Sequence, residues 1–198
     1  MNKIVIIGAG GHGRVVADIA RACGYEEIVF LDDADRILAS GKIADFIKYK
    51  ENASFVVAIG NSKVREKIQN QLLDNGCEMA RLIHPNSVIG NNVYIGIGTV
   101  VMAGTVINNG AKIGDGVIIN TSSSVDHDNV IGDYSHVSVG AHLAGTVEIG
   151  KHTWIGAGAA VSNNVSICEK CMIGAGAVVV KNIEESGTYI GVPARKMK

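Results

Sequence analysis

Long apolar runs are missing from this 198-residue sequence, and none reaches the roughly 18 residues that a transmembrane helix needs. An excess of one charge is missing too: 18 Lys and Arg residues balance 19 Asp and Glu residues, which argues against a broad basic surface for nucleic acid. The four cysteines are too few for a disulfide scaffold, and the apolar run near the start is too short for a signal peptide. We expect a cytoplasmic protein with no nucleic-acid partner and no transmembrane segment.

Aromatic residues make up only 5% of the sequence, whereas its 25 glycines accompany many Ile and Val residues. This composition indicates an architecture more regular than that of an ordinary mixed domain. A repeat accounts for it, because every sixth residue from Ile83 to Val179 is Ile, Val or Leu. Neither a helix nor a strand has this period. We therefore predict a parallel β-helix with three short faces per coil, in which each aliphatic side chain points inward and stacks on its equivalent in the next coil.

Two other positions of the six-residue repeat support this prediction. The fourth residue after each aliphatic residue is mostly small or apolar, with Asn129 as the polar exception. The residue directly after the aliphatic one is often glycine, which we expect to turn a corner of the coil with a backbone angle that other residues avoid. These glycines are Gly90, Gly96, Gly114, Gly132, Gly150, Gly156 and Gly174. The pattern [LIV]-G-x-x-x-x resembles that of the hexapeptide-repeat acyltransferases, and the resemblance implies a left-handed β-helix and a trimer.

The first part of the sequence alternates between strand and helix patterns, which predicts a small α/β unit with a parallel sheet. We place one domain at residues 1–82 and the β-helix at residues 83–198. The elements expected in the first domain are strands at residues 3–7, 27–31 and 55–59, a helix at residues 15–23, and a second helix that runs from an N-cap at Ser62 to about residue 75.

The carboxyl ends of the three strands carry Gly10-Gly11-His12, Asp32-Asp33 and Gly60-Asn61, and we expect them to line one ligand pocket. The first of these segments lies in a G-x-G-x-x-G pattern that matches the dinucleotide fingerprint. Three strands make only half of a dinucleotide-binding sheet, however. A glycine turn at a helix N-terminus binds the diphosphate of a nucleotide sugar equally well, so both ligands stay open on this pattern alone.

His127 is the residue of the β-helix most suited to chemistry. It lies two residues after the inward Val125, so its side chain should project outward, and Asp126 and Asp128 flank it. A carboxylate on one ring nitrogen fixes the tautomer and makes the other nitrogen a better base. A solvated polar corner would also explain the three residues. The likeness of the coil to acyltransferases favours the general base.

Further motifs extend the resemblance over nearly the whole chain. They are Ile7-Gly8-Ala9-Gly10-Gly11-His12-Gly13, Phe30-Leu31-Asp32-Asp33, Ala58-Ile59-Gly60-Asn61, Ile83-His84-Pro85, Asn120-Thr121-Ser122, His127-Asp128, residues 135–141 and Gly191-Val192-Pro193-Ala194. In this order they resemble the NeuD/PglD-type sugar-nucleotide acetyltransferases, above all the bacillosamine branch. The resemblance implies a small Rossmann-like α/β domain that binds a nucleotide sugar, followed by a left-handed parallel β-helix, in a homotrimer with active sites between subunits.

The resemblance also implies roles for individual residues. The catalytic residues would be His127 as the base, Asp128 as the acid that raises its basicity, and Asn120, which positions the acceptor. In the bacillosamine branch that acid is typically Glu, so Asp128 is one methylene shorter. The sugar-nucleotide contacts would be Gly10, Gly11, His12, Asp32, Asp33, Gly60 and Asn61. The acetyl-CoA contacts would be His136, Ala144, Gly145, Ala157 and Ala175, and no metal is implied.

The function implied is acetyl transfer from acetyl-CoA to the 4-amino group of a UDP-linked 4-amino-4,6-dideoxy sugar. The amine would attack directly, and the N–H of Gly145 would stabilise the oxyanion. Three alternatives stay open: O-acetylation of sialic acid or a related sugar, N-acetylation of another nucleotide-linked amino sugar such as GDP-perosamine, and a non-catalytic trimeric scaffold that binds nucleotide sugars.

The six-residue repeat also predicts where four other residues lie. Cys168 and Cys171 lack the second pair of ligands that a structural zinc site needs, so we expect them to pack in the coil. His152 is expected to be exposed at a corner, and Trp154 is expected to point outward.

Overall fold

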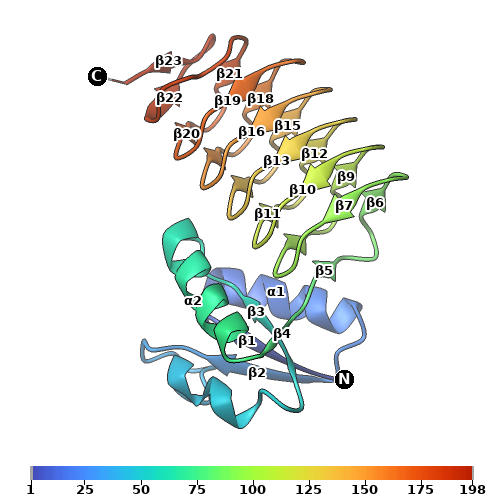
Figure 1. Ribbon diagram of the computed structural model, residues 1–198, viewed down its shortest axis with the longest axis vertical. Helices are drawn as coiled ribbons and strands as arrows, with labels where there is room; N and C mark the ends of the chain where they lie inside the picture. Colours follow the sequence, from blue (N-terminus) through green and yellow to red (C-terminus); the bar gives the residue numbers. More distant parts are fainter. Residues whose placement is uncertain (1, 198) are drawn as a thin grey trace.

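The computed structural model describes residues 2–197. It has an α/β unit at the N-terminal end and a column of flat coils that leads away from it to the C-terminus (Figure 1). Across residues 2–197, no helix has the length and apolar character needed to cross a membrane.

The α/β unit contains a four-stranded parallel sheet in the order β2-β1-β3-β4. Its strands are β1 (Lys3–Ile7), β2 (Glu27–Leu31), β3 (Ser54–Val57) and β4 (Glu78–Met79). Helix α1 (Gly11–Ala22) packs with Ile4 and Ile6 on one face, whereas η1 (Ile43–Lys48) and α2 (Ser62–Asp74) pack with Val5 and Ile7 on the other. The parallel sheet and its first two strands are confirmed, and the third strand starts and ends slightly earlier than predicted.

Both helix starts differ from the prediction. Helix α1 begins at Gly11 rather than at residue 15, because the glycine turn itself forms the first helical residues. The N-cap of α2 is Asn61, not Ser62: its Oδ1 accepts hydrogen bonds from the N–H groups of Lys63 and Val64, both at 3.1 Å. Asn61 therefore has a structural role at the end of β3 in addition to any ligand contact.

The predicted parallel β-helix is confirmed. Its first sheet contains β5 (Leu82–Ile83), β8 (Val100–Val101), β11 (Ile118–Ile119), β14 (His136–Val137), β17 (Trp154–Ile155), β20 (Met172–Ile173), β22 (Thr188–Ile190) and the antiparallel β23 (Arg195–Lys196). The second contains β6 (Val88–Ile89), β9 (Val106–Ile107), β12 (Ser124–Val125), β15 (His142–Leu143), β18 (Ala160–Val161) and β21 (Val178–Val179). The third contains β7 (Tyr94–Ile95), β10 (Lys112–Ile113), β13 (Val130–Ile131), β16 (Glu148–Ile149) and β19 (Ser166–Ile167).

Successive strands of each sheet pair in the register that the repeat predicts, for example Ile119 with Val137 and Val137 with Ile155. The aliphatic residues of the repeat form one continuous buried core along the column. The outer face of the first sheet contributes Val100, Met102 and Ile118 to the core around α1, so this helix packs between the α/β sheet and the coils.

The role predicted for the glycine after each aliphatic residue is wrong. Gly96 and Gly156 lie outside the left-handed region. They are needed because successive coils approach closely there: a Cβ on Gly96 would lie 2.3 Å from Asp115 Oδ1, and one on Gly156 would lie 2.5 Å from the carbonyl oxygen of Ile173. The left-handed corner comes two residues later, as at Gly98, with φ of 70°. Non-glycine residues fill it at several corners, including Asp128, Tyr134 and His152.

Asn129, the polar exception of the inward positions, is fully buried and hydrogen-bonded. Its Nδ2 donates to the carbonyl oxygens of Asp126 at 2.7 Å and Ala144 at 3.0 Å, and its Oδ1 accepts from the N–H of Val147 at 2.9 Å. Asn129 thus ties together backbone groups at the corner that carries His127.

We expect Asn129→Ala to destabilise the protein by about 2–4 kcal/mol, because three backbone groups around the buried amide lose this partner. The measurement is the free energy of unfolding from denaturant titration. The exposed Asn109 is the matched control, and Asn109→Ala should change the same free energy by less than about 0.5 kcal/mol. Equal effects of the two substitutions would contradict the structural role of Asn129.

Candidate active site

His127 follows β12 at a corner of the coil, and 57% of its side chain is exposed. Its Nδ1 lies 2.9 Å from Oδ2 of Asp128. Asp126 does not bind the ring; its Oδ1 accepts from the backbone N–H of His127 at 2.8 Å and from Nδ2 of Asn108 at 2.7 Å. The two acids therefore have different tasks, since Asp128 orients the imidazole and Asp126 fixes the backbone that carries it.

The hydrogen bond that the imidazole makes to Asp128 raises the pKa of His127 above its ordinary value; desolvation opposes this shift, and the negative charges of Asp126 and Asp128 add to it. An ionised carboxylate only accepts hydrogen bonds, so Nδ1 carries the proton and Nε2 of a neutral ring is the free basic atom. Asp128 adopts the left-handed conformation, with φ of 57°, which Asp tolerates better than most residues. The corner geometry of the repeat thus places the carboxylate beside the ring.

Gly145 lies directly against the ring in the next coil. A Cβ on Gly145 would lie 2.4 Å from Nε2 of His127, and the N–H of Thr146 donates to the His127 carbonyl at 2.9 Å. Among residues 2–197, no backbone hydrogen bond uses the N–H of Gly145. A basic nitrogen and an N–H without a backbone partner therefore belong to the same corner.

A hollow of about 300 Å³ opens beside this corner. Asp126 and Ala144 line it together with Ser124 and His142, whose Oγ and Nδ1 are 2.8 Å apart. The floor of the hollow is aliphatic, with Leu143, Ala160 and Val161, and its other lining residue is Asn108.

His136, Asn120 and Trp154 form a second group on the first sheet. Nδ2 of Asn120 lies 3.0 Å from Nε2 of His136, whose ring packs against the indole of Trp154 with centroids 4.6 Å apart. Burial lowers the pKa of His136 to about 3, and the charge of Arg65 adds to this effect, so the ring is neutral. Trp154 lies outside the coil core and lines a hollow with His136, on which it packs; its Nε1 donates to Ser138 Oγ at 2.6 Å.

The five residues assigned to acetyl-CoA divide between these two places in one chain. Ala144 and Gly145 follow β15, at the corner of His127, whereas Ala157 and Ala175 follow β17 and β20, on the sheet that carries His136. Ala157 and Ala175 are exposed. Asn120 likewise follows a strand of the first sheet rather than of the sheet that carries His127.

At the α/β unit, Gly10 and Gly11 line a hollow of about 420 Å³ at the N-terminus of α1. A Cβ on Gly10 would meet no atom within 4 Å, so the space there is open, and the helix N-terminus favours an anion. Arg14 and Arg36 line the same hollow, and sequence reasoning missed both. The signal for Arg14 was a cation one helical turn after the glycines.

The two aspartates after β2 have structural partners. Asp32 accepts hydrogen bonds from the N–H groups of Ala9 and Ala34, both at 2.9 Å, and these bonds lower its pKa although partial burial opposes the shift. Oδ1 of Asp33 accepts from the N–H of Ile43 at the start of η1. Neither carboxylate lines the Gly10 hollow.

Gly60 and Asn61 line a different hollow, a cleft of about 450 Å³ between the N-terminus of α2 and the coils. Gly10 and Gly11 line the hollow at α1 instead, so the first and third strand ends open onto different hollows, and a single pocket shared by all three ends stays a prediction. The far wall of the cleft includes His136 and Trp154. His12 is largely buried, and burial lowers its pKa to about 4, with a contribution from the charge of Arg65.

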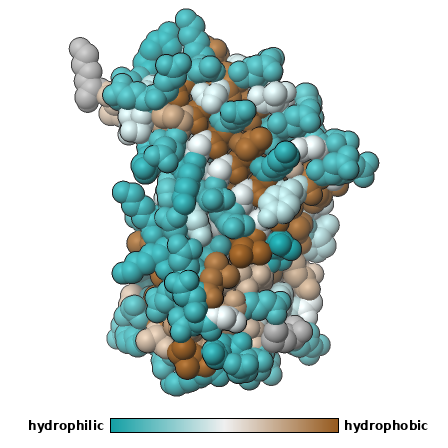
Figure 2. All heavy atoms as spheres, in the orientation of Figure 1, coloured by the Kyte–Doolittle hydropathy of each residue, from teal (hydrophilic) through white to brown (hydrophobic). Residues whose placement is uncertain are grey.

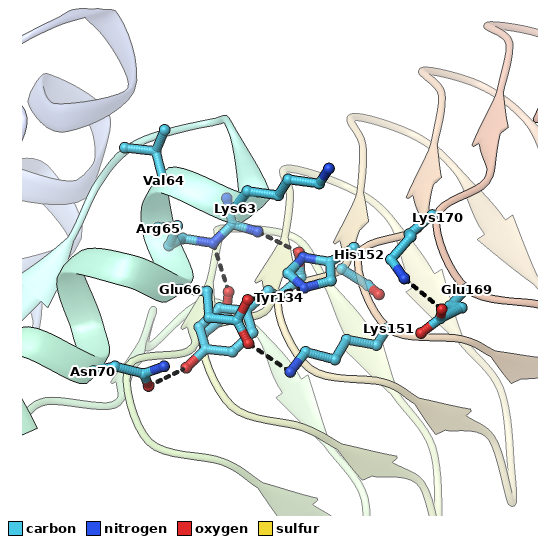
Figure 3. A network of polar contacts seen from close by, with 12 residues as sticks. Lys63, Val64, Arg65, Glu66, Asn70, Tyr134, Lys151, His152, Glu169 and Lys170 are labelled. Atoms are coloured by element: carbon cyan, nitrogen blue, oxygen red, sulfur yellow. Dashed lines mark hydrogen bonds and ion pairs between the residues drawn. The ribbon is translucent and has the colours of Figure 1, made fainter.

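His152, expected at an exposed corner, has a side chain that is only 7% exposed and packs between the two parts of the chain. Its Nε2 lies 3.1 Å from Glu66 of α2, and its ring stacks on Tyr134 (Figure 3). The prediction for the cysteines is confirmed: Cys171 is buried in the coil and both thiols are free, with the two sulfurs 3.5 Å apart. Within the described part of the chain, no group of three or more His, Cys, Asp or Glu residues is placed to hold a metal ion.

Comparisons with known proteins agree with this architecture. Residues 3–72 match the family model of the PglD N-terminal domain, and residues 86–121 and 146–181 match that of the bacterial transferase hexapeptide repeats. Between these two repeat segments, the coils continue through β12 to β15, the region of His127.

Three similar proteins are informative. UDP-N-acetylbacillosamine N-acetyltransferase of Bacillus subtilis (strain 168) is 33% identical over 113 residues, 52% of each chain, so the match spans about half the length of this curated relative. The acetyltransferase domain of PglB from Neisseria gonorrhoeae FA1090 is 38% identical over 100% of both chains, with a TM-score of 0.96. PerB from Caulobacter crescentus, solved with CoA and GDP-perosamine, is 37% identical over 99% of this chain and 97% of its own, with a TM-score of 0.94. The chain therefore belongs to the PglD-like family of hexapeptide-repeat acetyltransferases.

Proposed function

We propose that the protein transfers an acetyl group from acetyl-CoA to the amino group of a nucleotide-linked amino sugar. One observation carries the proposal: Nε2 of the exposed His127 has no hydrogen-bond partner in the described part of the chain, while Asp128 binds Nδ1 at 2.9 Å. A general base for an attacking amine needs this arrangement. The relatives that act on amino sugars or contain CoA support it.

In the proposed reaction, the neutral amine attacks the thioester carbonyl carbon and a C–N bond forms. Nε2 of His127 takes a proton from the amine. The N–H of Gly145 donates to the oxyanion of the tetrahedral intermediate. The C–S bond then breaks, and the proton on His127 goes to the leaving thiolate, which yields CoA and the acetylated sugar.

The hollow lined by Gly10 and Gly11 at the N-terminus of α1 is the proposed site of the nucleotide diphosphate. Its anionic oxygens would meet the helix N-terminus at Gly11 and His12, and the guanidinium groups of Arg14 and Arg36 would balance their charge. We propose that residues 1–82 bind the nucleotide sugar and that residues 83–198 form the acyltransferase domain.

The active site is proposed to lie between copies of the chain in a homotrimer of left-handed β-helices. In one chain, Gly145 and His127 lie at a different corner from Asn120 and His136. A neighbouring copy that presents its first sheet to the His127 corner would bring the two groups together. Apolar side chains gather along one face of the coils, with hydrophilic side chains beside them (Figure 2), and a contact between copies would cover such a surface.

The acceptor that we propose is the 4-amino group of a UDP-linked 4-amino-4,6-dideoxy sugar, as in bacillosamine-type glycan synthesis. A second candidate is GDP-perosamine, because the similarity to PerB extends over nearly the whole of both chains. The two candidates share the transferred group and the chemistry at His127 and differ in the base and the sugar.

A thiol-release assay tests the proposal. The purified protein is given acetyl-CoA and, in turn, UDP- and GDP-linked 4-amino sugars, with sialic acid as the hydroxyl acceptor. We expect stoichiometric release of CoA and formation of an amide with one of the amino sugars. Release of CoA only with sialic acid would show an O-acetyltransferase. If none of the acceptors leads to release of CoA, the non-catalytic scaffold alternative remains.

Asp128→Asn is expected to lower the pKa of His127 and to reduce kcat about tenfold. The wild-type pKa is raised mainly by the Asp128 hydrogen bond, so without the carboxylate the ring loses its proton at lower pH and becomes a weaker base. The midpoint of the His127 titration, followed by NMR of the imidazole, should move to lower pH. Asp126→Asn is the matched control and should move it less, because Asp126 binds the backbone. An equal shift for both variants would refute the assignment.

A further inference from the structure

Arg65 is a fully buried cation whose side-chain hydrogen bonds, among residues 2–197, all go to backbone carbonyl groups. It lies in the first turns of α2 and is 1% exposed. Its Nε donates to the carbonyl of Gly116 at 2.7 Å, and its two terminal nitrogens donate to those of Tyr134 at 2.6 Å, Ile59 at 2.7 Å and Gly60 at 2.9 Å. No ion pair of Arg65 occurs among the residues that the structure describes, which is unusual for a buried charge.

These four carbonyls come from two parts of the molecule. Ile59 and Gly60 belong to the loop that follows β3, whereas Gly116 and Tyr134 are corner residues of successive coils. Gly116 and Tyr134 both adopt the left-handed conformation, with φ of 59° and 57°. The planar, forked guanidinium is suited to binding acceptors in several directions at once, which a single ammonium group cannot reproduce. Arg65 therefore fastens the β3 loop to the coils.

Neighbouring residues of α2 join the helix to the coils without touching this loop (Figure 3). Glu66 pairs with Lys151 and with Nε2 of His152, and Oδ1 of Asn70 accepts from the hydroxyl of Tyr134 at 3.4 Å. Glu66 remains partly exposed. The contacts between α2 and the coils thus have two separable roles. Glu66 holds the helix against the coils, and Arg65 holds the loop after β3 against them.

The loop that Arg65 holds forms part of the cleft between α2 and the coils. Gly60 and Asn61 line one wall of that cleft, and His136 and Trp154 line the opposite wall. The positive charge of Arg65 also lowers the pKa of His12 and of His136, second to burial in each case. His12 Nε2 and His136 Nδ1 are buried without hydrogen-bond partners in the described chain, so each ring has one nitrogen that the folded chain leaves unpaired.

We propose that Arg65 is a positioning residue: by binding the carbonyls of Ile59 and Gly60 and those of two coil corners, it fixes the wall of the cleft in which the sugar of the nucleotide-linked substrate lies. This inference rests on the proposed function for the identity of the substrate. Arg65 itself touches no ligand, because its guanidinium is buried and its hydrogen bonds go to the backbone.

The experiment compares Arg65→Lys, which keeps the charge and loses the fork, with Glu66→Gln, which weakens the contacts between α2 and the coils outside the loop. Arg65→Met serves as a second variant that removes the charge. Two readouts are used: hydrogen–deuterium exchange of residues 58–64 in the ligand-free protein, and steady-state kinetics with acetyl-CoA and the amino sugar that the thiol-release assay identifies.

We expect Arg65→Lys to speed exchange in residues 58–64 and to raise KM for the nucleotide sugar at least tenfold, with KM for acetyl-CoA changed less than twofold. Glu66→Gln should lower Tm and leave both KM values within twofold. Unchanged exchange, or an equal rise in both KM values for Arg65→Lys, would overturn the proposal. If the wild type acetylates no amino sugar, the proposed function fails, and the exchange data with the Kd values for UDP and GDP still decide whether Arg65 fixes the loop.

Discussion

His127→Ala is expected to lower kcat about 10²- to 10⁴-fold, because the variant has no positioned base to accept the proton of the attacking amine. The imidazole is exposed, and within residues 2–197 Asp128 is its only side-chain hydrogen-bond partner, so its removal takes little from the fold. The measurement is kcat from the release of CoA at saturating concentrations of both substrates, with wild type and variant at the same pH.

The loss is informative only if the variant still assembles and binds its substrates. The elution volume on size exclusion, Tm and the Kd for CoA should all match those of the wild type. A loss of kcat with an unchanged Kd places His127 in the chemical step. A kcat within twofold of the wild-type value would refute the assignment of His127 as the base.

The architecture of the β-helix was predictable because its signal is periodic and local. Every inward residue sits at a fixed offset in the sequence, so the register of Ile119 on Val137 follows from counting. The reason for the glycine after each aliphatic residue was not predictable in the same way. Glycine is selected both where successive coils approach closely and where the backbone is left-handed. Only the three-dimensional structure shows that Gly96 meets the first requirement and Gly98 the second.

The candidate site was predictable where its residues are neighbours in sequence or lie in successive coils. His127 and Asp128 are adjacent, and the known period stacks Gly145 on His127. The role of Arg65 was not predictable, because two of its four partners lie 51 and 69 residues away and all four are backbone carbonyls, which leave no mark on residue type. His152 was misjudged because its partners, Glu66 of α2 and the ring of Tyr134, come together only in the folded chain.

The corner of His127 shows how the repeat serves the site that we propose. A regular corner needs a left-handed residue, and at this corner the residue is Asp128, whose carboxylate holds the ring. A regular inward position needs a small side chain, and here Asn129 ties Ala144 and Val147 of the next coil to the corner. Asp128 is thus one of several non-glycine residues at the left-handed corners, whereas Asn129 departs from the small or apolar pattern of the inward positions.

Gly145→Ala is expected to lower kcat about 10²-fold while leaving Tm within a few degrees of the wild-type value. The new Cβ would lie 2.4 Å from Nε2 and 2.6 Å from Cε1 of His127, so the ring has to move. Gly145 lies outside the left-handed region, so alanine strains no backbone angle there, and the exposed ring moves into solvent at little cost to the fold. A shift of the base by about 1 Å is enough for a loss of this size.

A double-mutant cycle separates displacement of the ring from a direct block of the thioester. If the methyl group acts by moving His127, Gly145→Ala has no further effect on kcat in the His127→Ala background, where the smaller side chain leaves room for it. If the methyl group instead obstructs acetyl-CoA, the loss persists in that background and the Kd for CoA rises in both. We expect the first result, since the atoms nearest to the added methyl group are those of the imidazole. Additive losses with a weakened Kd would show that Gly145 serves the binding of the cofactor and not the position of the base.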